Sequence, residues 1–107
     1  MRAYERLLRY LKFEAPSDAG SETFPSTPQQ LNFGRYLVQE MRELGIRDAE
    51  LDENGYVFGT IESNIKNWSG PVIGFLAHLD TVQDVPYQNI KAQIIEDYDG
   101  GDLCLNP

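Results

Sequence analysis

A run of consecutive apolar residues, Val-Ile-Gly-Phe-Leu-Ala at positions 72–77, constrains the fold of this chain more than any other segment. The run has no alternation of apolar and polar residues, and Gly70 and Pro71 precede it. A run this short fits a β-strand, and a strand without a polar face is typically covered on both sides. The sequence therefore predicts a strand between two layers, an arrangement typical of α/β proteins.

Two helices are predicted ahead of this strand. Apolar residues at helical spacing mark the first over residues 4–11, before a breaker segment at 14–20. The second has clearer boundaries: Thr27 stands at an N-cap position, Pro28 at the first helical position and Gln30 at the capping-box position. The residues of its expected buried face are Leu31, Gly34, Leu37, Val38, Met41 and Leu44, and Gly45 follows as a left-handed C-cap residue.

Further strands are expected on both sides of the apolar run. Residues 48–52 and 56–61 read as two strands joined by Asn54-Gly55, a pair that tolerates the positive φ angles of a type I′ turn. Another strand is expected at 90–95, and the last four residues offer no closing element. The predicted fold class is α/β, with two helices followed by a mixed β-sheet.

Charge and composition exclude several classes of protein. The chain has 9 basic and 17 acidic residues and a net charge of −8, so it lacks the basic stripe of a nucleic-acid binder. No apolar stretch approaches the roughly 20 residues that span a bilayer, and the N-terminus has no apolar signal-peptide segment. Cys104 is the only cysteine, so no internal disulfide can form. We expect a cytoplasmic protein without a nucleic-acid or membrane partner.

The candidate metal-binding and catalytic residues follow directly after the apolar run. His78 is the only histidine, and Asp80 follows two positions later. On a continuing strand the two side chains share a face, about 6.5 Å apart along the backbone. A neutral imidazole can bind zinc, and a nearby carboxylate can orient it. His-x-Asp is common, however, and a lone histidine at a strand end more often bonds to a neighbouring backbone group. The spacing is compatible with both interpretations of His78, as a metal ligand and as a histidine bonded to the backbone.

Three segments together resemble the peptidase T group of the two-zinc peptidases. Residues 73–81, Ile-Gly-Phe-Leu-Ala-His-Leu-Asp-Thr, resemble its first metal-site motif, with Asp84 shortly after. Pro-Ser-Thr at 25–27 precedes the second helix as in that group. Residues 93–102, Gln-Ile-Ile-Glu-Asp-Tyr-Asp-Gly-Gly-Asp, resemble a stretch that distinguishes tripeptidases from their relatives. Ala92 and Val82-Gln83 depart from the commoner residues of the group, and neither departure touches a metal ligand.

The resemblance implies that His78 ligates one of two zinc ions and that Asp80 supports the catalytic site. It implies that residues 1–107 are the N-terminal segment of a zinc peptidase catalytic domain, without the later ligands, the catalytic carboxylates and the lid domain. The parent protein would release the N-terminal residue from tripeptides, and this chain alone would be inactive. A stand-alone non-catalytic interaction module, or another two-zinc hydrolase such as a deacetylase or dipeptidase, are the alternatives.

The remaining candidate residues have simpler interpretations. Cys104 has no histidine close in sequence, so we interpret it as incidental rather than nucleophilic or metal-binding. Asp99 and Asp102 flank a Gly-Gly pair and fit a turn better than a calcium loop. Asp84 is expected to hold the loop after the metal site, if it has a role. The strand at 72–77 would expose apolar surface in an incomplete layer, so we expect the chain to self-associate.

Overall fold

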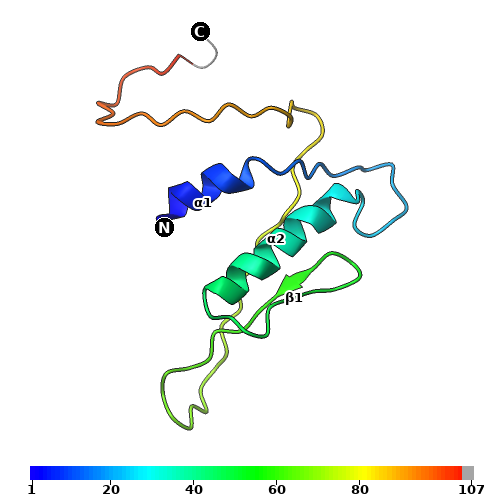
Figure 1. Ribbon diagram of the computed structural model, residues 1–107, viewed down its shortest axis with the longest axis vertical. Coiled ribbons are helices and arrows are strands. Elements are labelled where there is room, and N and C mark those ends of the chain that lie inside the picture. Colours follow the sequence, from blue (N-terminus) through cyan, green and yellow to red (C-terminus); the bar gives the residue numbers. More distant parts are fainter. Residues whose placement is uncertain (105–107) are drawn as a thin grey trace.

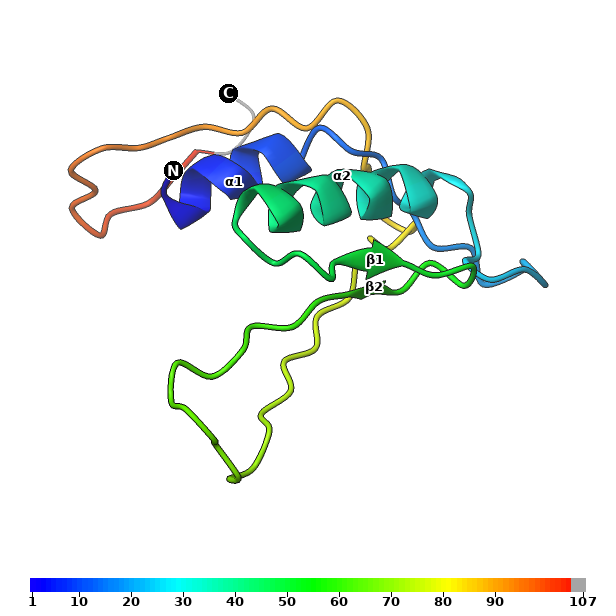
Figure 2. The same cartoon turned by 60° about the horizontal axis from the view of Figure 1, so that its bottom comes forward.

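The computed structural model describes residues 1–104, in which two helices precede a short hairpin (Figure 1). Helix α1 spans Ala3–Tyr10 and α2 spans Gln29–Glu43. Strands β1 (Glu50–Leu51) and β2 (Val57–Phe58) pair in antiparallel register. Figure 2 shows the hairpin lying along one side of α2. The predicted helices and the predicted hairpin are confirmed, although both strands are shorter than expected.

Aromatic side chains join the end of α1 to the middle of α2. Phe13 stacks on Phe33 with ring centroids 5.2 Å apart and lies 4.8 Å from the ring of Tyr36. Tyr10 contacts the same two rings at 5.4 and 6.1 Å. Aromatic pairs at these separations stabilise beyond the apolar area that they bury. This cluster therefore fixes how the first helix lies against the second.

The C-terminus of α2 has the predicted left-handed cap. Gly45 has a φ of 95°, which glycine adopts without the steric cost of a Cβ. The N–H of Gly45 donates to the carbonyl of Arg42 at 3.0 Å, and that of Ile46 donates to Met41 at 3.0 Å. These two bonds are the pair that defines a Schellman motif. The cap turns the chain back, so that the hairpin returns along α2.

The start of α2 differs from the prediction. The helix begins at Gln29, Pro28 occupies the N-cap position, and no side chain there caps the helix. Thr27 lies one residue too early, and its hydroxyl donates instead to the carbonyl of Pro16 at 2.6 Å. The predicted capping box is therefore wrong, because a bond to a distant backbone oxygen replaces the local one.

The hairpin packs on α2 at a position without a side chain. A Cβ on Gly34 would lie 2.8 Å from Cδ1 of Leu51, so the absence of a side chain lets β1 approach the helix. The turn is not type I′, because Gly55 has a positive φ and Asn54 does not. The N–H of Gly55 donates to the carbonyl of Asp52, and Asp52 pairs again with Tyr56. This pattern is a three-residue loop with glycine in the left-handed position.

The predicted strand at 72–77 is wrong: these residues form no strand in the structure. Val72, Phe75 and Leu76 are 94%, 95% and 97% exposed. A strand needs backbone partners on at least one edge, and among residues 1–104 the only sheet is the β1–β2 hairpin. The strand expected at 90–95 is absent for the same reason, so the sheet is antiparallel rather than mixed. Residues 105–107, with the expected boundary at 107, lie outside the described residues.

Two arms project from the helix–hairpin unit, at residues 60–72 and after residue 88 (Figure 1). The radius of gyration is 17.5 Å, whereas a compact domain of this length has about 13 Å. The accessible surface is 9506 Å², against roughly 6,100 Å² for a compact protein of this mass. The buried hydrophobic core of the described residues is correspondingly small and comprises Ala15, Val38 and Ala49. Much apolar surface is therefore left uncovered.

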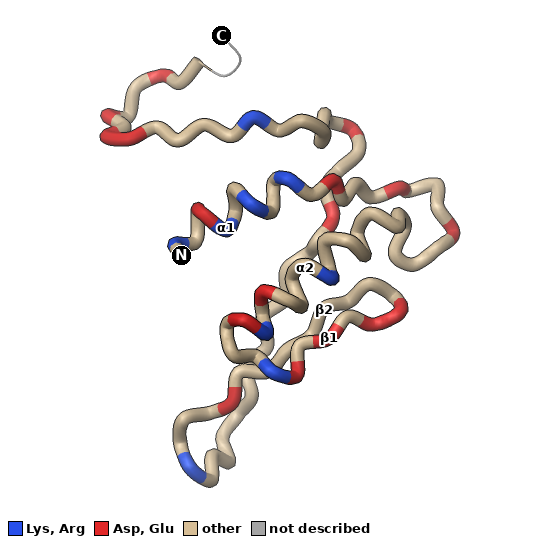
Figure 3. The backbone as a smooth tube through the Cα atoms, viewed as in Figure 1, with Lys and Arg blue, Asp and Glu red and all other residues tan. Residues whose placement is uncertain are grey.

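Charged residues are spread over the helices and loops (Figure 3). Arg9 of α1 is exposed, as are Arg2 just before the helix and Lys12 just beyond it, whereas Arg6 is half-buried. Within the described residues, no helix combines the length and the apolar character needed to cross a membrane.

Candidate functional site

His78 and Asp80 contact one another directly. Nδ1 of His78 lies 2.8 Å from the backbone oxygen of Asp80 and 3.1 Å from its Oδ1. Both partners are hydrogen-bond acceptors, so Nδ1 must carry the hydrogen. In the neutral imidazole, Nε2 then keeps its lone pair, which is the form that binds a metal. The His78 side chain is 84% exposed and that of Asp80 38%, so Nε2 is open to a ligand.

Both interpretations of His78 left open by the sequence fit this geometry. The histidine does bond to a neighbouring backbone group, as a lone histidine commonly does. That bond occupies Nδ1 only, and the carboxylate of Asp80 lies on the same side of the ring. The structure therefore brings the predicted pair together and assigns the contact to one ring nitrogen. The roles of the two residues in metal binding and catalysis stay predictions.

The segment after this pair is held by a short parallel bridge to the loop between the helices. The N–H of Thr81 donates to the carbonyl of Ala15 at 2.8 Å, and the N–H of Ser17 donates to the carbonyl of Thr81 at 2.8 Å. The hydroxyl of Ser17 adds a bond to the same Thr81 oxygen at 3.1 Å. Ala15 and Pro16 are buried here. The bridge fixes the backbone one residue beyond Asp80.

The bridge is tied in turn to the beginning of α2. The carbonyl of Pro16 accepts one bond from the hydroxyl of Thr27 at 2.6 Å and another from Nε2 of Gln30 at 3.1 Å. Nε2 of Gln30 also lies 3.0 Å from the hydroxyl of Ser26. The sequence predicts helix capping for Thr27 and Gln30, and this second role was not predicted. The available signal was a pair of polar side chains around the start of the helix, Thr27 before it and Gln30 in its first turn, which can bond to distant groups as well as to the local backbone.

A cavity of about 590 Å³ opens beside His78 and Asp80. Three segments line it: the loop before α2, the hairpin turn and the chain leading to the pair. This volume lies in the range of small-molecule sites. Its apolar and aromatic lining residues include Phe24, Pro25, Tyr56, Phe75, Leu76 and Leu79.

A complete metal site does not form among residues 1–104. No group of three or more His, Cys, Asp or Glu side chains in that part of the chain could hold an ion. His78 and Asp80 fit one corner of a zinc ligand set, whereas a catalytic zinc usually has three protein ligands. Cys104 is exposed. The carboxylate of Asp99 accepts from the N–H of Gly101 at 3.0 Å, which is the predicted turn.

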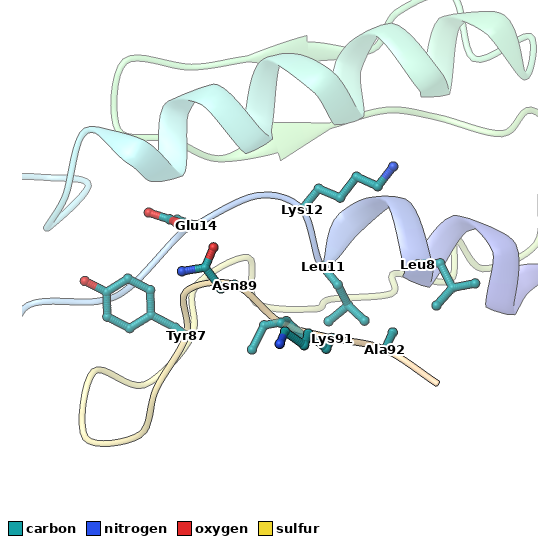
Figure 4. Close-up of a pocket in the computed structure, with 9 residues that line it drawn as sticks. Leu8, Leu11, Lys12, Glu14, Tyr87, Asn89, Lys91 and Ala92 are labelled. Atoms are coloured by element: carbon teal, nitrogen blue, oxygen red, sulfur yellow. The ribbon is translucent and has the colours of Figure 1, made fainter. Parts of the chain in front are cut away.

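A second cavity of about 550 Å³ lies between the α1 segment and residues 87–92. Figure 4 shows Leu8 and Leu11 of the α1 segment facing the arm that carries Lys91 and Ala92. Glu14 is the only acidic residue of its lining, and Nε2 of Gln88 donates to it at 3.3 Å. Neither His78 nor Asp80 reaches this cavity, so it is separate from the candidate site.

Sequence comparison finds curated proteins that are similar to nearly the whole of this chain. No protein-family profile matches it. The relatives found among curated proteins are named Peptidase T. The protein from Halothermothrix orenii is 48% identical over 105 residues, which are 98% of this chain and 26% of the relative. Those from Bacillus pumilus and Bacillus subtilis are 50% and 49% identical over 102 residues, 95% of this chain and 25% of each relative.

These comparisons confirm the resemblance to the peptidase T group that the motifs predicted. The chain spans about a quarter of the length of the curated relatives it matches. The similarity covers nearly the whole chain, including the His78–Asp80 region and the helix–hairpin unit.

Proposed function

We propose that this chain contributes one corner of the active site of a zinc-dependent aminopeptidase that acts on tripeptides. The observation that carries the proposal is the contact between His78 and Asp80, which commits Nδ1 as a donor and leaves Nε2 as a metal ligand. The similarity to proteins named Peptidase T supports peptide hydrolysis as the reaction. The tripeptide preference rests on the resemblance of residues 93–102.

Each residue has a distinct task in this proposal. His78 binds the metal through Nε2, and Asp80 holds the imidazole in the required tautomer through its backbone and carboxylate oxygens. Bound zinc would supply Lewis-acid activation of a water molecule and of the peptide carbonyl. The cavity beside the pair offers a wall for the substrate, formed by the Phe24–Pro25 loop and Tyr56.

The remaining donors of the site are proposed to come from elsewhere in a longer protein. His78 and Asp80 leave a tetrahedral zinc short of ligands. The 107-residue chain on its own is accordingly proposed to bind zinc weakly and to cleave no peptide.

Zinc titration by calorimetry tests this division of the site. The wild-type chain and His78→Ala should both bind weakly, while in a protein extended to the full length of the relatives His78→Ala should abolish zinc-dependent activity. That longer protein should cleave tripeptides with a free N-terminus faster than dipeptides or tetrapeptides. A preference for acylated amino acids would refute the peptidase assignment. Tight stoichiometric zinc binding by the 107-residue chain, lost in His78→Ala, would refute the split site.

One observation favours a second candidate, a non-catalytic interaction module. The apolar residues Val72, Phe75 and Leu76 are almost fully exposed, as they would be on a surface that binds a partner. The reading frame of the gene separates the two candidates. An open frame that continues into further acidic metal-site motifs favours the peptidase, and a stop directly after codon 107 favours the module.

A further inference from the structure

We propose that Thr27 and Gln30, at the beginning of α2, are positioning residues for the His78–Asp80 pair. The proposal deepens the proposed function and rests on it for the role of His78. The geometry itself, however, can be measured without metal or substrate. Neither residue is hydrogen-bonded to His78, so the proposed effect travels through the backbone that joins them.

The first link is the carbonyl of Pro16. It accepts bonds from the hydroxyl of Thr27 at 2.6 Å and from the amide of Gln30 at 3.1 Å. The same amide nitrogen lies 3.2 Å from the Thr27 hydroxyl, so the two side chains form one network. Removal of both donors would leave this carbonyl without a hydrogen-bond partner. The loss would be costly, because Pro16 is buried and water cannot readily replace the donors. The start of α2 thus holds the loop between the helices at one peptide unit.

The second link is the bridge between that peptide unit and Thr81. Ala15 and Ser17, on either side of Pro16, bond to the N–H and the carbonyl of Thr81 at 2.8 Å each. Among residues 1–104 no other backbone–backbone hydrogen bond joins the segment beyond residue 60 to the first 60 residues. The direction of the chain at Asp80 therefore depends on these two bonds.

The third link is the contact between Asp80 and the ring of His78. The backbone oxygen that accepts from Nδ1 belongs to the peptide unit that ends at the nitrogen of Thr81. Rotation of that unit would move the acceptor away from the ring, and the hydrogen of the imidazole would no longer be held on Nδ1. Because the bridge holds the Thr81 nitrogen against Ala15, it also fixes that acceptor. Loss of the Thr27 and Gln30 donors should therefore weaken the hydrogen bond at Nδ1 of His78.

Two variants and two matched controls test this chain of contacts in the 107-residue protein. Gln30→Met keeps the length of the side chain but removes the donor, and Thr27→Val removes the hydroxyl while keeping the shape. Gln39→Met is the control in the same helix, where the amide donates at 3.0 Å only to exposed Glu43. Thr27→Ser keeps the hydroxyl and should restore the wild-type behaviour.

Two readouts follow the links separately. Amide hydrogen exchange at Thr81 reports the bridge, and nitrogen NMR of His78, at a pH where the ring is neutral, reports which ring nitrogen carries the hydrogen. In Gln30→Met and Thr27→Val, exchange at Thr81 should accelerate about tenfold, as expected for one lost hydrogen bond. The Nδ1–H form of His78 should decrease in both. Thr27→Ser and Gln39→Met should stay within about twofold of the wild type.

Several results would overturn the proposal. One is a Thr27→Val variant in which amide exchange at Thr81 and the tautomer of His78 are both unchanged. This result would overturn the proposal even if Gln30→Met does not fold. Equal acceleration in Gln39→Met would also overturn it, since general loosening of α2 would then explain the effect. A wild-type His78 that carries its hydrogen on Nε2 would remove the third link. Loss of the peptidase assignment would leave all these measurements unaffected, so the two failures are distinguishable.

Discussion

The hydroxyl of Tyr10, at the end of α1, donates a hydrogen bond to Oε2 of Glu40 on α2. Glu40 is the buried charged residue of the described chain, with 8% of its surface exposed. The bond joins the two helices at the aromatic cluster and gives the buried carboxylate a partner. Burial, together with the bond to Glu40 and its negative charge, raises the pKa of Tyr10 from 10.0 to about 12.

This raised pKa predicts a loss of stability at alkaline pH. Between pH 10 and 12 an unfolded Tyr10 has lost its proton and the folded one keeps it, so the free energy of unfolding decreases as pH rises through that window. The contribution is fully present below pH 10. Allowing for partial solvent exposure, we expect a loss of roughly 1–2 kcal/mol. Denaturant unfolding at pH 9 and 11.5 measures it. Tyr10→Phe should be less sensitive, and equal sensitivity of the two proteins would contradict the assignment.

The close approach of β1 to α2 predicts an asymmetric response at Gly34. Gly34→Val should destabilise the protein by about 1–3 kcal/mol, because a Cβ there lies 2.8 Å from Leu51 and branching leaves no room. Gly34→Ala should be nearly neutral, since Leu51 can rotate and alanine favours the helix by about 1 kcal/mol. Urea midpoints measure both. Gly74→Val, where nothing lies within 4 Å, is the control, and a cost there equal to that at Gly34 would refute the packing argument.

The exposed apolar segment predicts self-association. Phe75 and Leu76 are 95% and 97% exposed, and uncovered apolar surface favours contact between copies. Light scattering at rising concentration should give a mean mass above that of one chain. The double substitution Phe75→Ser and Leu76→Lys should return the mass to that of a monomer, whereas Leu44→Ser, at a position 54% exposed, should not. A wild-type chain that stays monomeric at high concentration would rule out this prediction.

A contact at the open end of the hairpin predicts a response to acid. Hydrogen bonds from Thr60 lower the pKa of Asp48, and the N–H of Thr60 lies 3.0 Å from Oδ1 of the carboxylate. Because the pKa of Asp48 is lower in the folded state, its carboxylate contributes to the free energy of unfolding. That contribution is fully present above the ordinary pKa of 3.8 and is lost as the pH falls through the folded pKa. An NMR titration of Asp48 should give a lower midpoint in the wild type than in Thr60→Pro, which lacks the N–H. Identical midpoints would show that Thr60 does not hold the carboxylate.

The parts of the fold that could be predicted are those stabilised by local interactions. Apolar spacing marked α1 and α2, and Gly45 marked the end of the second helix, because helices and their caps depend on neighbours within a few residues. The hairpin was also predicted, although its turn type was not: Asn54 keeps a negative φ and Gly55 alone supplies the left-handed residue. An Asn-Gly pair is compatible with both turns, so composition could not separate them.

The parts that could not be predicted depend on distant partners. An apolar run such as 72–77 indicates what a segment needs, namely cover on both faces, but not whether that cover is present. His78 and Asp80 contact each other without the predicted strand, because residues two apart in the sequence can meet without the pairing that a strand needs. The network of Thr27, Gln30 and Pro16 was missed because its bonds join residues 11 and 14 positions apart.

The bridge between Pro16 and Thr81 also has a consequence for the order of folding. Ser17 and Thr81 are 64 residues apart, so their contact closes a long loop. Closing such a loop costs roughly 2 kcal/mol more conformational entropy than closing the hairpin. The helices and the hairpin should therefore assemble first, with contacts that are near in sequence, and the bridge should close onto them last. The orientation of His78 is then the final feature the chain acquires and the first it gives up when it begins to unfold.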